Sequence, residues 1–173
     1  MKKIICVLIS AAFIVGCSTT LTLQNSIPYE TQQLIKSVQT NSTINYKYVP
    51  NQAGEVLHTR RMYSINKSLE GMLKELIESK FNSVSESATN SIIVELEKVK
   101  ADDDVGAWDV THNLNITRKV SLQRDGKNSG RDFNYSTSFV LKDSNYEREV
   151  IESLLLKFIV AIDKFIDTEF EVQ

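Results

Sequence analysis

The chain has 173 residues, of which 42% are hydrophobic, so it is long enough for one domain with a core of its own. Its 20 lysines and arginines nearly balance its 22 aspartates and glutamates, and this charge gives no basic footprint for nucleic acid. Both cysteines, Cys6 and Cys17, lie near the start of the chain. The remaining sequence therefore offers no thiol for a disulfide or for a thiolate metal site.

The first 16 residues have the composition of a secretory signal. Two lysines precede the apolar segment 4–15, which as a helix is about 18 Å long and so shorter than a ~30 Å hydrocarbon core. We therefore predict a signal peptide over residues 1–16, an N-terminal tether over 17–42 and a single domain over 43–173. Secretion with cleavage at another site and an uncleaved anchor are the alternatives.

The segment Val15-Gly16-Cys17 ends this signal and resembles the lipobox of bacterial lipoproteins. The resemblance implies that Cys17 is diacylated and becomes the acylated N-terminus once the signal peptide is removed. Several acyl chains together anchor a protein stably to a bilayer. In such lipoproteins an aspartate after the cysteine tends to retain the protein at the inner membrane. Ser18 stands there instead, so we expect the outer membrane, with the domain facing the periplasm.

A strand is predicted from residue 43 onward. Ile44, Tyr46 and Tyr48 alternate with polar residues, and Pro50 ends the run. Residues 51–54 are then predicted to form a turn.

An amphipathic helix is predicted from Ser64 to Phe81, because apolar residues recur there at helical spacing. Gly71 inside it costs about 1 kcal/mol relative to alanine, so packing must compensate. A polar loop over 83–90 separates this helix from a second strand, Ile92–Leu96.

The strongest pattern is a long alternation from Trp108 to Leu122. Largely apolar side chains hold the even positions, His112 and Arg118 among them, and polar side chains hold the odd positions. This is typical of an antiparallel strand that is covered on one face. A hairpin loop over 125–130 leads into a returning strand over 133–141.

The polar face of this long strand and an exposed edge strand are the candidate binding surfaces for a protein partner. Such a face is rich in donors and acceptors and poor in fixed charge. The polar face carries Thr111, Asn113, Asn115, Thr117 and Lys119.

Ser144 and Glu147 have capping-box spacing in front of an apolar run, which predicts a second amphipathic helix that ends near Phe170. A sheet with one apolar face needs a cover, and two helices with apolar stripes supply it. We therefore predict an α+β fold in which an antiparallel sheet of about four strands carries two amphipathic helices on one face.

No catalytic centre is predicted. His58 and His112 are the two histidines, and we expect His112 to be a core side chain satisfied by a neighbour. The sequence has no nucleophile elbow, phosphate-binding loop or metalloprotease helix motif. We therefore expect no enzyme activity, no cofactor and no metal site.

Two charged groups have alternative interpretations. Asp102–Asp104 with Asp109 suggest calcium, but the EF-hand spacing is absent, so a solvated acidic turn between strands is favoured. Arg60-Arg61 and Arg118-Lys119 suggest a site for lipid headgroups. Neighbouring residues on a strand point to opposite faces, however, and solvated surface pairs are favoured.

The strand aromatics are expected to pack across the sheet in the core. The alternative is an apolar groove between sheet and helices that admits an acyl chain. These aromatics are Tyr46, Tyr48, Phe133, Tyr135 and Phe139.

Five features occur together over the lipobox and residues 43–165: Cys17, the helix segment Leu69-Glu70-Gly71-Met72-Leu73, the strand Ile92–Leu96, the acidic segment 101–105, and a long hairpin with a closing helix. This layout resembles small outer-membrane lipoproteins of the YajG type and, more loosely, the auxiliary lipoproteins of PqiC-type lipid-transport systems.

The resemblance and the lack of a catalytic motif favour a non-enzymatic envelope lipoprotein that acts as a protein-interaction or assembly module. Its partners would be the membrane, through the acyl chains, and an envelope protein. The alternative is a lipid-binding auxiliary subunit of an envelope lipid-transport system. A close-packed interior favours docking, whereas an open apolar groove favours lipid handling.

Overall fold

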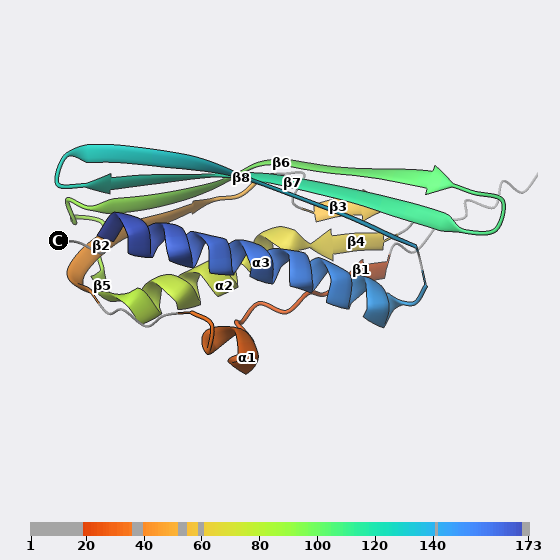
Figure 1. The fold of residues 1–173 in the computed structure, drawn as a ribbon, viewed down its shortest axis with the longest axis horizontal. Helices are drawn as coiled ribbons and strands as arrows, with labels where there is room; N and C mark the ends of the chain where they lie inside the picture. Colours follow the sequence, from red (N-terminus) through yellow and green to blue (C-terminus); the bar gives the residue numbers. More distant parts are fainter. Residues whose placement is uncertain (1–18, 36–39, 52–54, 59–60, 141, 171–173) are drawn as a thin grey trace, which may run out of the picture.

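The computed structural model of the chain describes residues 19–35, 40–51, 55–58, 61–140 and 142–170 (Figure 1). In chain order its elements are β1 (Thr19–Leu21), α1 (Tyr29–Gln32), β2 (Thr40–Val49), β3 (Glu55–His58), β4 (Arg61–Ser64), α2 (Ile65–Lys80), β5 (Phe81–Val84), β6 (Ser91–Val105), β7 (Val110–Arg124), β8 (Lys127–Val140) and α3 (Ser144–Phe170). None of the helices in these ranges is both long and apolar enough to span a bilayer.

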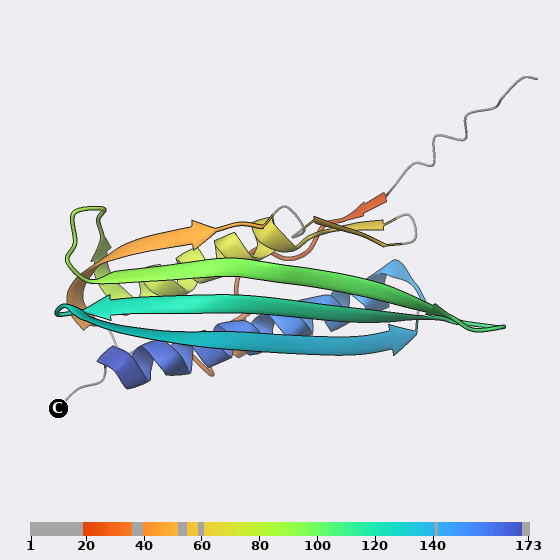
Figure 2. The same ribbon diagram turned by 90° about the horizontal axis from the view of Figure 1, so that it is seen from above.

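The larger sheet has five strands in the order β5-β2-β6-β7-β8. β6, β7 and β8 form an antiparallel meander, whereas β2 runs parallel to both of its neighbours. Helices α2 and α3 cover one face of this sheet, and the opposite face of the long strands is open (Figure 1 and Figure 2). The predicted α+β fold, with two helices on one face of a sheet, is confirmed.

The direction of β2 differs from the predicted antiparallel arrangement. A parallel pair needs a long crossover connection, and residues 50–90 supply one that contains a β-hairpin and α2. Alternation in a sequence indicates which side chains share a face, but it carries no information about strand direction. β5 lies partly in the segment predicted as a polar loop. Phe81 is its one buried residue, so the strand has no apolar alternation from which it could be predicted.

A smaller sheet begins in the described part of the predicted tether, which covers residues 19–35 and 40–42 of the predicted range 17–42. Its strand order is β1-β4-β3, with β1 parallel to β4. After β1 the chain buries Leu23 and Ile27 in the core. The Leu23 N–H donates to Ser64 Oγ at 3.2 Å, and the Ile27 N–H donates to Glu75 Oε2 at 2.7 Å. The described part of this segment therefore belongs to the folded domain.

Gly71 lies where this N-terminal segment crosses α2. A Cβ atom on residue 71 would overlap the backbone carbonyl oxygen of Asn25. One turn earlier, Ser68 Oγ donates a hydrogen bond to the carbonyl oxygen of Gln24. The close approach of the two backbones offsets the ~1 kcal/mol that glycine costs in a helix interior.

The core fills the space between the helices and the covered face of the sheet. In β7 the even-numbered side chains from His112 to Leu122 are buried and the odd-numbered ones are exposed or half-buried, so the predicted faces are confirmed. The predicted start of the strand is wrong. β7 begins at Val110, and Trp108 lies in the preceding turn, 99% exposed.

The start of α3 also differs from the predicted capping box. Asp143 Oδ1 accepts hydrogen bonds from two backbone N–H groups of the first turn, at 2.9 and 3.0 Å, so Asp143 and not Ser144 caps the helix. Glu147 is fully buried and accepts a hydrogen bond from the Tyr63 hydroxyl at 3.3 Å. Asp143 caps the helix, so Glu147 is not the capping-box partner of Ser144. It instead forms a core contact between α3 and β4.

Candidate functional site

The predicted lipidation site, Cys17, lies outside the described residues, two positions before β1. The same holds for Arg60 and for the side chains of His58 and Arg61. The lipidation of Cys17 and the roles of the other three side chains therefore stay predictions from the sequence.

The predicted polar face of β7 lies on the open side of the sheet. Asn115 and Lys119 are exposed there. Two side-chain hydrogen bonds link this face to β8: Thr117 Oγ1 donates to Asn134 Oδ1 at 2.8 Å, and Ser138 Oγ donates to Asn113 Oδ1 at 2.7 Å. The face is therefore polar and partly satisfied by its own neighbours.

His112 is buried and bonded to a neighbour, as predicted. Its Nδ1 lies in hydrogen-bond contact with Asp103 Oδ1 on β6, directly opposite in the strand register. Its ring packs against Phe139 at 5.5 Å between centroids. The imidazole therefore connects all three long strands inside the core.

The aspartate run is not a turn, which corrects that prediction. Asp102–Asp104 lie inside β6 and pair with β7. Asp103 turns to the covered face and His112, whereas Asp102 and Asp104 are exposed on the open face. Within the described ranges, no three side chains of His, Cys, Asp or Glu are grouped as a metal ion would need.

Arg118 is buried, which corrects its predicted place on a solvated surface. Its guanidinium lies 4.2 Å from the ring centroid of Phe158 on α3, and its three nitrogens have no hydrogen-bond partner among the described residues. Burial lowers the pKa of Arg118 to about 9, against the opposing effect of the hydroxyls of Tyr48 and Tyr135. Lys119 is exposed, so the prediction that the pair points to opposite faces is confirmed.

The strand aromatics pack in the core, as predicted, but chiefly against α3. Phe133 meets Phe158 edge-on at 5.6 Å, and Tyr135 meets the same ring at 6.3 Å. Burial raises the pKa of Tyr46 and Tyr48, so both hydroxyls are neutral at physiological pH. The layer between helices and sheet is thus filled by side chains.

Two of the surface depressions in the described part of the chain adjoin each other along α3. The β8–α3 groove has a volume of about 270 Å³ and runs between Ser136 and Thr137 of β8 and the side of α3. The α1–α3 groove, of about 640 Å³, lies between α1 and the outer surface of α3. Both grooves are lined by Glu149, Ser153 and Lys157, so they are adjoining.

These three groove residues belong to no motif that the sequence reveals. Glu149, Ser153 and Lys157 follow one another at intervals of four, which places them on one face of a helix. That spacing marks an exposed face of the predicted second helix. That this helix face lies next to β8 and α1 is set by tertiary packing, which helical spacing alone does not predict.

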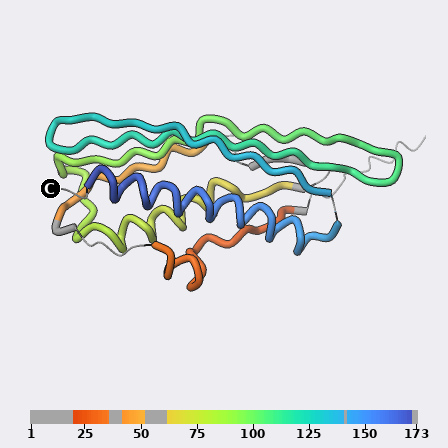
Figure 3. The backbone as a smooth tube through the Cα atoms, viewed as in Figure 1, coloured from red at the N-terminus to blue at the C-terminus, as the bar shows by residue number. Residues whose placement is uncertain are grey.

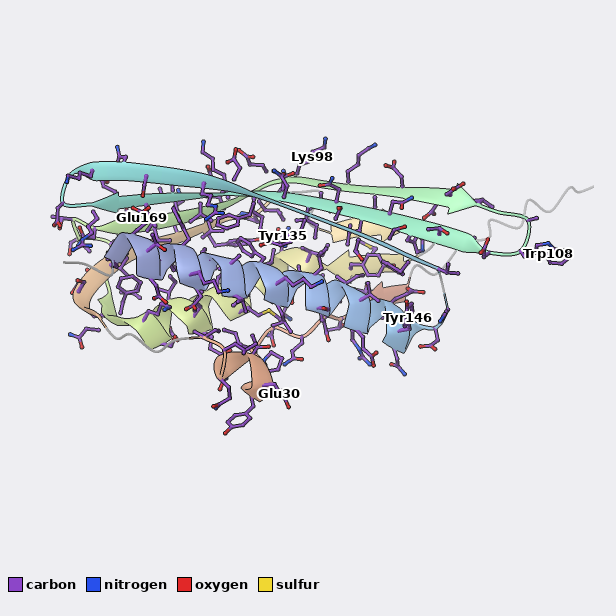
Figure 4. All side chains as sticks on the ribbon, in the orientation of Figure 1. Glu30, Lys98, Trp108, Tyr135, Tyr146 and Glu169 are labelled. Carbon is purple, nitrogen blue, oxygen red and sulfur yellow. The ribbon has the colours of Figure 1, made fainter. Side chains whose placement is uncertain are left out.

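A further exposed feature is the turn between β6 and β7. The Gly106 N–H donates to the carbonyl oxygen of Asp109 at 2.9 Å and closes this turn. Trp108 stands at its tip (Figure 4), and Val105 beside it is 70% exposed.

The comparisons with known proteins concern the fold. No family model and no curated protein matches this sequence. A solved structure from Xanthomonas campestris, of family DUF330, superimposes with a TM-score of 0.54 at 11% identity, over 84% of this chain and 92% of that one. This likeness shows a shared fold, that of an α+β domain with helices on one face of a sheet.

Two further solved structures are more distant. A minor lipoprotein from Acinetobacter baumannii has a TM-score of 0.45 at 11% identity, over 75% of this chain and 94% of that one. A putative neuraminyllactose-binding hemagglutinin homolog from Helicobacter pylori has a TM-score of 0.45 at 17% identity, over 83% and 90%. At these scores neither likeness carries an argument about this chain.

Proposed function

We propose that this chain is a non-enzymatic envelope lipoprotein that binds a protein partner as an added strand on β8. The observation that carries the proposal is the free outer edge of β8, which is the last strand on its side of the larger sheet in the described part of the chain. An exposed edge presents a row of backbone donors and acceptors to another chain. Many recognition domains bind extended peptides in this way.

The edge is long and carries little protection. β8 has 14 residues, and its segment 133–140 contains neither a charged residue nor a proline. Natural sheets usually block their edges with such residues or with a covering element. The charged residues of β8 are Lys127, Arg131 and Asp132, all in its first half. Segment 133–140 is therefore the preferred place for an added strand.

The β8–α3 groove supplies a place for the partner's side chains. Alternate residues of an added strand point to the helix-covered side of the sheet. On that side the groove offers apolar contact from Val150 and Leu154, with Glu149 and Lys157 of opposite charge nearby. Backbone pairing would supply affinity and the groove would supply specificity.

The proposal that the chain is not an enzyme is supported by the places of its buried ionisable groups. His112 is bonded to Asp103, and Lys80 forms ion pairs with Asp163 and Asp167. These groups lie in the core and do not line either groove. Their contacts serve packing, whereas catalytic groups gather in a cleft.

We expect one of two proline variants, Ser136→Pro or Thr137→Pro, to keep the fold and lose the partner. Adjacent residues of a strand direct their N–H groups to opposite sides, so one of the two donors faces β7 and the other faces outward. Proline at the outward position removes a donor for the added strand without breaking the β7 ladder. A photoreactive residue at Ser138 in intact cells measures partner capture, and thermal melts measure the fold.

A photoreactive residue at Asn115, which lies on the same open face as Ser138 but one strand further from the edge, is the matched control. Capture of one envelope protein from Ser138, weak capture from Asn115 and loss of capture in the stable proline variant support the proposal. Equal capture by both proline variants and the unchanged protein contradicts edge pairing. Capture from Asn115 alone places the partner on the polar face.

We also propose that acyl chains on Cys17 hold the domain on the outer membrane, facing the periplasm. The support is the lipobox-like segment Val15-Gly16-Cys17 and the serine that follows it. We expect Cys17→Ala to remain unprocessed and to incorporate no palmitate analogue, since the thiol carries the first acyl group. Metabolic labelling with Ser18→Ala as the control measures this, and label retained on the Cys17→Ala protein contradicts the anchor.

The α1–α3 groove supports the alternative function, a lipid-binding auxiliary subunit of an envelope lipid-transport system. Its lining includes Pro28, Leu34, Leu156 and Val160, with Lys157 available to an anionic headgroup. A photoreactive residue at Leu156 that captures phospholipid, with no protein captured from Ser138, would favour this function.

A further inference from the structure

The start of the described chain and the turn between β6 and β7 lie at the same end of the molecule. β1 begins at Thr19 at the end where the β6–β7 hairpin extends past the start of α3, and two perpendicular views agree on this (Figure 1 and Figure 2). The hairpin reaches beyond the rest of the fold there (Figure 3). Helix α3 ends near the opposite end.

This hairpin presents apolar side chains to solvent. Trp108 is 99% exposed and Val105 is 70% exposed. Single exposed apolar residues are ordinary on a protein surface. Here, however, a tryptophan stands at the outermost turn, and the segment 105–108 carries no charge. The hydrogen bond that closes the turn, from the Gly106 N–H to the Asp109 carbonyl, holds this tip in shape.

We propose that the tip formed by residues 105–108 inserts into the membrane–water interface of the bilayer that holds the acyl chains of Cys17. The inference rests on the lipid anchor of the proposed function. Cys17 precedes Thr19 by two residues, a span of at most about 7 Å, so the anchored bilayer surface lies close to this end of the domain.

The chemistry of the tip matches the membrane interface. Tryptophan is enriched there, because its ring is apolar while its N–H bonds to the wet headgroup layer. Tethering makes the contact between tip and lipid intramolecular, so that even a weak contact is populated. The domain then has two attachment points and stands with its long axis away from the bilayer, which leaves β8 free for a partner.

The charges behind the tip select the kind of lipid surface. Asp102, Asp104 and Asp109 are exposed within a few residues of Trp108. Anionic lipid would repel these carboxylates over about a Debye length, ~10 Å at 0.1 M salt. The tip therefore fits a zwitterionic surface, and on an anionic surface added salt should restore the contact.

Trp108 reports on its own environment, since it is the sole tryptophan of the chain. The test reconstitutes the full mature acylated protein into phosphatidylcholine vesicles and records its emission. We expect a shift to shorter wavelength and loss of most of the emission when the lipids carry bromine atoms close to the headgroup. Phosphatidylglycerol vesicles at low salt should show weaker quenching, which rises again as salt is added.

The matched control moves the tryptophan to another exposed site. The double variant Trp108→Phe with Tyr29→Trp places it on α1, where Tyr29 is 71% exposed. That tryptophan should keep its emission in the same vesicles. If Trp108 is quenched no more than position 29 while the protein floats with the vesicles, the tip does not enter the bilayer and the anchor stands. Protein that fails to float overturns the anchor and this inference together.

Discussion

The variant Ile116→Asp is expected to lose most or all of its stable fold. Ile116 is fully buried near the middle of β7, opposite Val99 on β6 and Tyr135 on β8. A carboxylate placed there replaces an apolar side chain in the packed core, and burying it costs several kcal/mol. The guanidinium of Arg118, two positions further on the same face, is already stacked over the Phe158 ring, so pairing with it would disrupt that contact. A domain of this size is stable by about 5–15 kcal/mol in total. Circular dichroism melts should show either no cooperative transition or a large drop in Tm.

The neighbouring variant Asn115→Asp is the control. Asn115 differs by one position and faces water on the open side of the sheet. Its substitution introduces the same carboxylate and is expected to change the free energy of unfolding by no more than about 0.5 kcal/mol. Equal losses from both variants would contradict the assignment of the two faces.

This pair of variants reflects what the sequence predicts well. Alternation over more than a dozen residues repeats one physical signal many times, so the faces of β7 are predictable without knowledge of the neighbouring strands. The same holds for α2 and α3, whose apolar stripes recur over many turns. Buried faces and helix positions are local consequences of burial, which the order of apolar residues records directly.

Short elements and ends were harder to predict. β1, β3, β4 and β5 have three or four residues each, too few for a period to stand out. Trp108 continues the alternation of β7 by chance of spacing, yet the chain turns at Gly106–Asp109 and leaves it in solvent. The composition of the aspartate run predicts a turn, whereas pairing with β7 keeps the run extended.

The candidate site depends on information that a single sequence does not carry. Segment 133–140 is an edge because of the order of strands in the sheet, and the grooves form because α1 and β8 meet α3. These are tertiary relations between segments far apart in the chain. Arg118 illustrates the same limit. Its guanidinium stacks over the ring of Phe158, which lies 40 positions further along the chain.

The second large effect is expected from Lys80→Met. Lys80 is the last residue of α2 and is fully buried, with Nζ 2.6 Å from Asp163 Oδ1 and 2.5 Å from Asp167 Oδ1 on α3. Removing the cation leaves the buried Asp163 carboxylate without its counterion. Breaking one side of a buried ion pair typically costs about 3–5 kcal/mol. Urea titration should show a lower midpoint with an unchanged slope.

A double variant separates the loss of the cation from the loss of its packing. Lys80→Met with Asp163→Leu replaces both buried charges by apolar groups, and such replacements are often neutral or stabilising. We therefore expect the double variant to recover most of the stability, with Asp167 turning to water because it is partly exposed. Lys74→Met is the surface control, since Lys74 and its partner Glu78 are both exposed and an exposed pair contributes ~0–1 kcal/mol. A double variant no more stable than Lys80→Met alone would show that the lysine stem, and not the charge balance, holds α2 against α3.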